Sequence, residues 1–377
     1  MHLYIHIPFC KKACHYCDFH FSTNLSRQDE MVDSICKEIA VQRNFLQNKS
    51  LETIYFGGGT PSLLSSSQLQ RIMDSIAKYF SLTNLKEVTF EANPDDINAA
   101  SLKSWKKAGV NRLSVGVQSF DDTTLQFMNR AHSSREAINA LQETHSTFGS
   151  NISFDLIYTR NATVFDENQQ NELLLKDIEI LASFDINHVS AYSLTIENKT
   201  AMAKWIEKGT LMNVPEAYAE RQFKIVTEGL QKLGFEQYEI ASFTKNKAYA
   251  IHNTAYWQNK PYLGVGPGAH SFDGENRFAN VANNQLYLKG LAENKLTQTK
   301  EILSEKDKFN DLVLCGLRTI WGLDLDLVKD KSFLNTTFWE AVNFYTQKQM
   351  LSHNNNTLII TPKGRIMADA ITADLFA

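Results

Sequence analysis

The sequence predicts an α/β protein, a partial (β/α)6 barrel followed by a smaller α+β C-terminal domain. Over residues 1–235, short apolar, β-branched runs alternate six times with longer amphipathic stretches. This alternation is typical of parallel strands joined by right-handed helical crossovers. A complete barrel of this type needs eight units, so six indicate an incomplete one. After residue 235 the alternation stops, and helices precede a short strand near the C-terminus.

The six apolar runs are the predicted strands, and the intervals between and after them are the predicted helices. The strands are expected at 3–7, 53–56, 88–91, 113–117, 152–157 and 189–194, and the helices at 27–48, 66–80, 98–108, 133–148, 166–183 and 215–233. Pro215 suits the start of the sixth helix, and Gly109 and Gly234 suit helix C-terminal ends. Six serial units would also fit an open doubly wound sheet, but we favour the partial barrel.

The residues after 235 predict a second domain. Glycines and aromatic residues across 236–300 indicate loops with short elements. Helices are expected at 304–321 and 333–350, a strand at 358–361 and an amphipathic end at 366–376. Helices followed by a small β element are typical of a winged-helix-like module. We therefore expect two domains, 1–235 and 236–377, which pack together because no long linker separates them.

Composition narrows the class of protein. Lysine and arginine total 38 against 42 aspartate and glutamate, which does not indicate a dedicated nucleic-acid binder. The sequence contains neither an apolar run long enough to span a membrane nor a secretory signal pattern. We expect a cytoplasmic protein, with peripheral membrane contact left open. Five cysteines, three of them within eight positions, fit a reduced protein with a metal site.

Cys10, Cys14 and Cys17 form a C-x3-C-x2-C motif directly after the first predicted strand. Thiolates suit iron–sulfur clusters or zinc. Three cysteines on one loop can ligate three corners of a [4Fe–4S] cube and leave one iron open. A zinc site is the alternative, with His15 or His20 as the fourth ligand.

Further polar residues follow the predicted strands. The segment 57–62, Gly-Gly-Gly-Thr-Pro-Ser, follows the second strand and lacks the lysine of a phosphate-binding P-loop. Glu91 and Gln118 end the third and fourth strands, Arg130 comes soon after, and Asp155 lies within the fifth. Loops at the carboxyl ends of parallel strands build the sites of α/β barrels. We therefore expect these side chains at one site.

The cysteine motif resembles that of the radical S-adenosylmethionine (SAM) superfamily. The segments 4–10 (Tyr-Ile-His-Ile-Pro-Phe-Cys) and 16–19 (Tyr-Cys-Asp-Phe) are similar to the branch that holds oxygen-independent coproporphyrinogen dehydrogenases and HemW-type heme chaperones. The resemblance implies a barrel of the radical SAM type, a [4Fe–4S] cluster and SAM on its open iron. It also implies that the SAM-binding residues are Tyr4, Tyr16, Gly58, Gly59, Thr60, Glu91, Gln118, Arg130 and Asp155. One departure is the segment 158–161, Tyr-Thr-Arg-Asn, where the family has a Gly-Leu-Pro turn.

A second motif distinguishes the two members of this branch. His252, Tyr256 and Trp257 match the HNxxYW motif of the HemW type, which implies a heme site with an imidazole ligand and aromatic contacts. From the chemistry alone, the alternative that His252 is a buried structural histidine beside packed aromatic residues remains open. His270, in a glycine-rich segment, is a second candidate without an assigned role.

The resemblance implies a heme chaperone that binds heme and passes it to an acceptor hemoprotein, such as a respiratory one, with an electron donor for the cluster. The alternative is a coproporphyrinogen III dehydrogenase. Phe19 stands where those enzymes carry a further cysteine, and the first strand begins at residue 3 without their N-terminal extension. We therefore do not expect that activity, and whether the chain is an enzyme stays open. A zinc-stabilised binding module is the third hypothesis.

Overall fold

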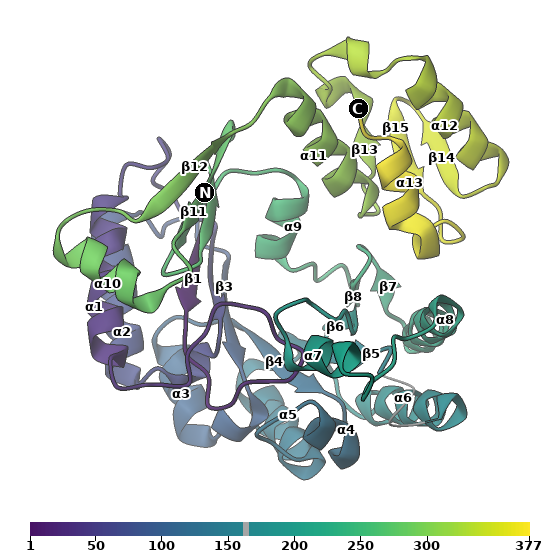
Figure 1. Cartoon of the computed structure of the whole chain (residues 1–377). Coiled ribbons are helices and arrows are strands. Elements are labelled where there is room, and N and C mark those ends of the chain that lie inside the picture. The colour runs from purple at the N-terminus through teal and green to yellow at the C-terminus, as the bar shows by residue number, and fades with distance from the viewer. Residues whose placement is uncertain (161–165) are drawn as a thin grey trace.

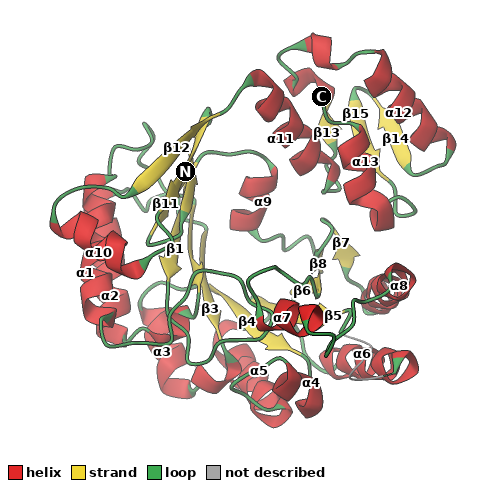
Figure 2. Ribbon diagram, viewed as in Figure 1, coloured by secondary structure: helices red, strands yellow, loops and turns green. Residues whose placement is uncertain are grey.

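The computed structural model describes residues 1–160 and 166–377. Its centre is a curved sheet with helices along the outer face (Figures 1 and 2). Six parallel strands form the middle of this sheet in chain order: β1 (His2–Ile7), β2 (Thr53–Gly58), β3 (Glu87–Ala92), β4 (Arg112–Gln118), β5 (Ile152–Tyr158) and β6 (His188–Ser193). The predicted strands and their parallel order are therefore confirmed.

The helices that follow these strands cover the outer face of the sheet. They are α1 (Gln28–Val41), α2 (Ser66–Tyr79), α3 (Ala99–Lys107), α5 (Ser134–Phe148), α6 (Glu167–Leu181) and α8 (Glu216–Lys232). Two short helices that the sequence analysis missed are α4 (Asp122–Phe127) and α7 (Ala201–Glu207). The first predicted helix is shorter than expected, since α1 ends at Val41 rather than near residue 48. Gly109 and Gly234 adopt positive φ just after helices, as expected.

Residues 236–302 form more of the sheet than the sequence analysis predicted. They contain β7 (Glu236–Gln237), β8 (Ser242–Thr244), α9 (Ile251–Trp257), β9 (Tyr262–Val265), β10 (His270–Phe272), β11 (Asn276–Asn280), α10 (Asn284–Ala292) and β12 (Gln298–Ile302). The strand order is β12-β11-β10-β9-β1-β2-β3-β4-β5-β6-β8-β7. Strand β9 runs parallel to β1, with His2 opposite Tyr262, so the sheet continues past both ends of the six parallel strands.

The last part of the chain forms a separate small module. It comprises α11 (Glu305–Leu317), β13 (Leu323–Asp324), α12 (Thr336–Gln347), β14 (Leu351–Asn354), β15 (Thr357–Ile360) and α13 (Ala368–Asp374). The three strands pair antiparallel in the order β13-β15-β14, which agrees with the expected helices and small β element.

The buried apolar side chains of the described residues form two large hydrophobic cores and a small third cluster around Met128 and Met202, and the domain boundary at residue 235 stays a prediction. The core beneath the large sheet extends to Leu291, whereas the core of the small module begins at Phe309. The segment 236–302 therefore packs with the barrel. No helix in the described part of the chain is both long and apolar enough to cross a membrane.

Candidate functional site

A cavity of about 370 Å³ lies at the carboxyl ends of the parallel strands; we call it the first cavity. It is lined by the three cysteines of the motif and by eight of the nine residues expected to bind SAM: Tyr16, Gly58, Gly59, Thr60, Glu91, Gln118, Arg130 and Asp155. The carboxyl ends of parallel strands meet at one edge of a sheet, which explains this convergence.

The loop that carries the cysteines is held on several sides by backbone contacts. The amide of Cys10 donates to the carbonyl of Ser22 over 3.1 Å, and the amide of Cys17 donates to the carbonyl of Cys14 over 3.3 Å. Both backbone polar groups of His15 are bonded: its amide donates to the carbonyl of Met128, and its carbonyl accepts from the amide of Met202. The middle of the cysteine loop is therefore held by segments more than 100 positions along the chain, and its ends are held by contacts within the loop and with Ser22.

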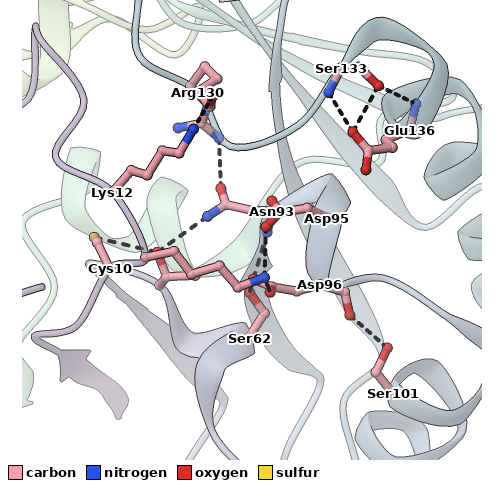
Figure 3. Close-up of polar contacts among 12 residues, drawn as sticks. Cys10, Lys12, Ser62, Asn93, Asp95, Asp96, Ser101, Arg130, Ser133 and Glu136 are labelled. Carbon is pink, nitrogen blue, oxygen red and sulfur yellow. Dashed lines mark hydrogen bonds and ion pairs between the residues drawn. The ribbon is translucent and has the colours of Figure 1, made fainter. Parts of the chain in front are cut away.

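Two donors reach the cysteine sulfurs. The Thr60 hydroxyl donates to Cys10 Sγ and Arg130 Nη1 donates to Cys14 Sγ, each over 3.4 Å. Arg130 Nη2 also donates over 2.7 Å to Asn93 Oδ1, and the Asn93 amide donates to Thr60 Oγ1 over 3.3 Å. Figure 3 shows Asn93 between Arg130 and Cys10. Donors directed at sulfur favour thiolates, so this network fits Cys10 and Cys14 as cluster ligands.

The arrangement fits a cluster better than a single zinc ion. In the described residues, no three His, Cys, Asp or Glu side chains converge on one ion position. Each cysteine of a [4Fe–4S] cube binds a different iron, so the three sulfurs need not converge. The two histidines considered for zinc have other partners, because His15 Nδ1 bonds the Phe127 carbonyl over 2.8 Å and His20 Nε2 bonds Asn284 Oδ1 over 2.7 Å.

The glycines at the end of β2 are required by close packing. A Cβ on Gly58 would lie 2.6 Å from His6 Nδ1, and Gly58 has φ of +109°. A Cβ on Gly59 would lie 2.6 Å from the carbonyl oxygen of Phe9. The bare backbone therefore lets the turn after β2 lie directly against the start of the cysteine loop.

Two carboxyl groups face the same cavity. Glu91 Oε1 accepts from the Tyr55 hydroxyl over 2.7 Å, and burial raises the pKa of Glu91 to about 7. Asp155 accepts from the Ser114 hydroxyl over 3.2 Å, and burial raises its pKa to about 6. Such carboxyl groups can accept hydrogen bonds from a polar ligand. At neutral pH they also provide negative charge for a cationic ligand.

Several lining residues escaped the sequence analysis. Asn93, Ser114 and Tyr192 belong to this group. Asn93 and Tyr192 lie at the carboxyl ends of β3 and β6, so the position at the strand end was the available signal. In the segment 158–161, Tyr-Thr-Arg-Asn, the side chain of Arg160 is buried and forms an ion pair with Asp177 of α6. Asn161 lies outside the described residues.

Tyr4, the ninth expected SAM residue, lines a different cavity. This second cavity, of about 390 Å³, is lined by Tyr4, Tyr55, Tyr192, Glu239, Ala241, Ser242, His252, Asn253, Tyr256, Trp257 and Arg318. It therefore brings together the three residues of the expected heme site. The two cavities are neighbours, because Tyr192 lines both of them. In addition, Tyr55 of the second cavity donates a hydrogen bond to Glu91 of the first. His270 lines neither cavity.

His252 is buried and fully bonded. Its Nδ1 bonds Thr53 Oγ1 over 2.7 Å, and its Nε2 bonds the Tyr256 hydroxyl over 2.8 Å. Burial holds its pKa well below the usual value, so the ring is neutral. An iron ligand at Nε2 would have to replace the Tyr256 hydroxyl, and the heme-ligand role of His252 stays a prediction.

Comparison with known proteins identifies the family to which the chain belongs. The family model for the radical SAM superfamily matches residues 4–163. Heme chaperone HemW of Bacillus subtilis is 32% identical over 374 residues, 98% of this chain and 97% of that protein. Heme chaperone HemW of Lactococcus lactis is 30% identical, covering 96% and 93% of the two chains. The solved structure of coproporphyrinogen III oxidase (HemN) from Escherichia coli has a TM-score of 0.81 and 20% identity, and covers 100% of this chain and 89% of that one. That structural match confirms the predicted fold class. The near-complete coverage of the HemW relatives shows that the chain belongs to the HemW family of the radical SAM superfamily.

Proposed function

We propose that this protein is a heme chaperone that carries a [4Fe–4S] cluster and SAM in the first cavity and heme in the second. One observation carries the proposal: the expected heme residues, His252, Tyr256 and Trp257, line a cavity next to that of the cysteine motif. Its relatives of nearly equal length are named as heme chaperones. A cytoplasmic location, suggested by five free cysteines, belongs to the same proposal.

In the first cavity, Cys10, Cys14 and Cys17 would hold the cluster. The cluster would supply an electron for cleavage of the SAM sulfonium, drawn from a donor protein. Arg130 and Thr60 would donate to the ligating sulfurs and stabilise their negative charge. Glu91 and Asp155 would accept hydrogen bonds from the amino or hydroxyl groups of SAM.

In the second cavity, five tyrosine and tryptophan rings provide flat apolar contact for a tetrapyrrole. The rings that line it beside His252 are those of Tyr4, Tyr55, Tyr192, Tyr256 and Trp257. Thr53 fixes the imidazole through Nδ1, which leaves Nε2 as the nitrogen for iron once the Tyr256 hydroxyl moves. Heme bound there would pass to an acceptor hemoprotein.

The test uses the full chain, reconstituted with iron and sulfide without oxygen. We expect iron and sulfide in the ratio of a [4Fe–4S] cluster, saturable heme binding and heme transfer to an apo-hemoprotein. The same sample is incubated with SAM, a reductant and coproporphyrinogen III, and no protoporphyrinogen is expected. Formation of protoporphyrinogen would contradict the proposal and support the dehydrogenase hypothesis. A sample that holds one zinc and no sulfide would contradict it and support the hypothesis of a zinc-stabilised binding module.

A further inference from the structure

Two charged side chains in the second cavity have no role in the function proposed so far. Glu239 lies between β7 and β8, and Arg318 follows α11 in the small C-terminal module. Glu239 and Thr319 form an isolated antiparallel bridge, and the amide of Ile320 donates to the Tyr238 carbonyl over 2.9 Å. These contacts place the start of the C-terminal module at the wall of the cavity.

Arg318 is only partly paired. Its Nη1 donates over 3.0 Å to Asp369, whose side chain is 88% exposed. Its guanidinium carbon lies 5.3 Å from the centroid of the Trp257 ring. Its Nε is buried and has no hydrogen-bond partner in the described structure. A buried donor without a partner is unfavourable, so a ligand with an acceptor at this position would bind favourably.

Glu239 is the second unsatisfied group. The residue is 5% exposed, and its Oε2 is buried without a partner among the described residues. Burial raises the pKa of this carboxyl group. Within the described part of the chain, Arg318 pairs with Asp369 and not with Glu239. A cation and a carboxyl group in one cavity that do not pair with each other are available to a third group.

We propose that Arg318 binds a propionate carboxylate of heme while the porphyrin lies against Trp257 and Tyr256. Arginine suits this role because its planar fork matches a carboxylate and its face stacks on aromatic rings. Glu239 in its ionised form repels a carboxylate on its own side, and in either form the only cation among the described residues of the cavity lining is Arg318, toward which the propionate edge would therefore lie. The C-terminal module thus supplies the group that recognises the acid side chains of the tetrapyrrole. This inference rests on the proposed heme function.

The experiment compares heme with heme dimethyl ester, which has the same ring and iron but no free carboxylate. Both are titrated into the full chain in the same detergent. The unchanged chain should bind heme at least about tenfold more tightly, the size expected for a hydrogen bond to a charged group. Arg318→Leu should bind both compounds with the affinity that the unchanged chain shows for the ester. Glu239→Gln should bind heme at least as tightly as before.

Asp369→Asn is the matched control, because it removes the ion pair of Arg318 and keeps the guanidinium. It should retain the preference for heme. A tenfold preference that survives in Arg318→Leu would overturn the inference, as would equal binding of heme and ester by the unchanged chain. These results leave the heme proposal standing. If the unchanged chain binds neither compound, the proposed function itself fails and this inference fails with it.

Discussion

At the scale of single residues, the polar side chains at the strand ends combine structural contacts with the capacity to bind ligands. Arg130 is the clearest case. It donates to Cys14 Sγ, to Asn93 and to the Gly116 carbonyl, so one side chain connects the cysteine loop with β3 and β4. Such a residue orients the ligands whether or not it touches SAM.

Replacing Cys14 tests the ligand assignment. Cys14→Ala removes one of three thiolates, so we expect loss of the cluster after anaerobic reconstitution, measured as iron and acid-labile sulfide. Cys36→Ala is the control, since Cys36 is half-buried on α1 and its thiol bonds the Arg71 carbonyl over 3.6 Å. Full iron and sulfide in Cys14→Ala would contradict the assignment.

Replacing Tyr256 tests the heme ligand. Tyr256→Phe removes the hydroxyl that occupies His252 Nε2 and keeps the ring. A hydrogen bond contributes about 1 kcal/mol net, so we expect heme to bind about fivefold more tightly, as followed by absorption titration. His252→Ala should bind heme more weakly. Unchanged heme titrations in both variants would exclude His252 as the ligand.

The Glu91 carboxyl group predicts a dependence of stability on pH. Its pKa of about 7 lies above the ordinary value of 4.5, so folding favours the protonated form. Its contribution is full below pH 4.5 and is lost as pH rises through 7. We expect Glu91→Gln, in the cluster-free protein, to gain about 3 kcal/mol in unfolding free energy relative to the unchanged chain between pH 4.5 and 8. Denaturant unfolding at both pH values measures this, and a constant difference would contradict it.

At the scale of elements, a buried ion pair fixes the ends of β4 and β5 against α6. Arg160 and Asp177 are 1% and 2% exposed and form an ion pair. Asp177 also accepts from the Ser119 hydroxyl over 3.0 Å and from the Phe120 amide over 2.7 Å. This network connects the segments that follow β4 and β5 to α6.

Breaking this pair should be costly. Asp177→Ala leaves a buried arginine without its partner, so we expect the free energy of unfolding to fall by about 3–5 kcal/mol, measured by denaturant unfolding. Arg221→Ala is the matched control, because Arg221 and Glu167 form a pair that is 51% and 39% exposed. Its loss should cost less than about 1 kcal/mol. Equal effects of the two substitutions would show that Asp177 is not a structural anchor.

At the scale of the whole molecule, the two large hydrophobic cores of the described residues lie on either side of the second cavity, and a small third cluster surrounds Met202. The larger lies under the twelve-stranded sheet and the smaller lies between α11, α12 and the three-stranded sheet. Trp257 of α9 and Arg318 after α11 meet at this boundary. The proposed heme cavity therefore depends on how the two cores pack together.

Substitutions in each core test this division. Leu358 of β15 is fully buried in the smaller core. Leu358→Ala should destabilise that core by about 2–5 kcal/mol and accelerate amide hydrogen exchange mainly in residues 305–375. Ile54→Ala, at a fully buried position of the larger core, should instead accelerate exchange across residues 1–302. Equal acceleration throughout the chain in both variants would indicate one cooperative unit.

The sequence by itself determined the six alternating strands and helices and the gathering of the cysteines with most strand-end residues. These features depend on local periodicity and on the rule that parallel strands end at one edge of a sheet. The tertiary structure alone placed β9 beside β1, because short strands with glycines give a weak local signal and the pairing joins His2 to Tyr262. It also decided that Tyr4 lines the second cavity and that both nitrogens of His252 are bonded. Tyr256 lies only four positions from His252, but Thr53 lies 199 positions away, so only packing selects the partner of Nδ1.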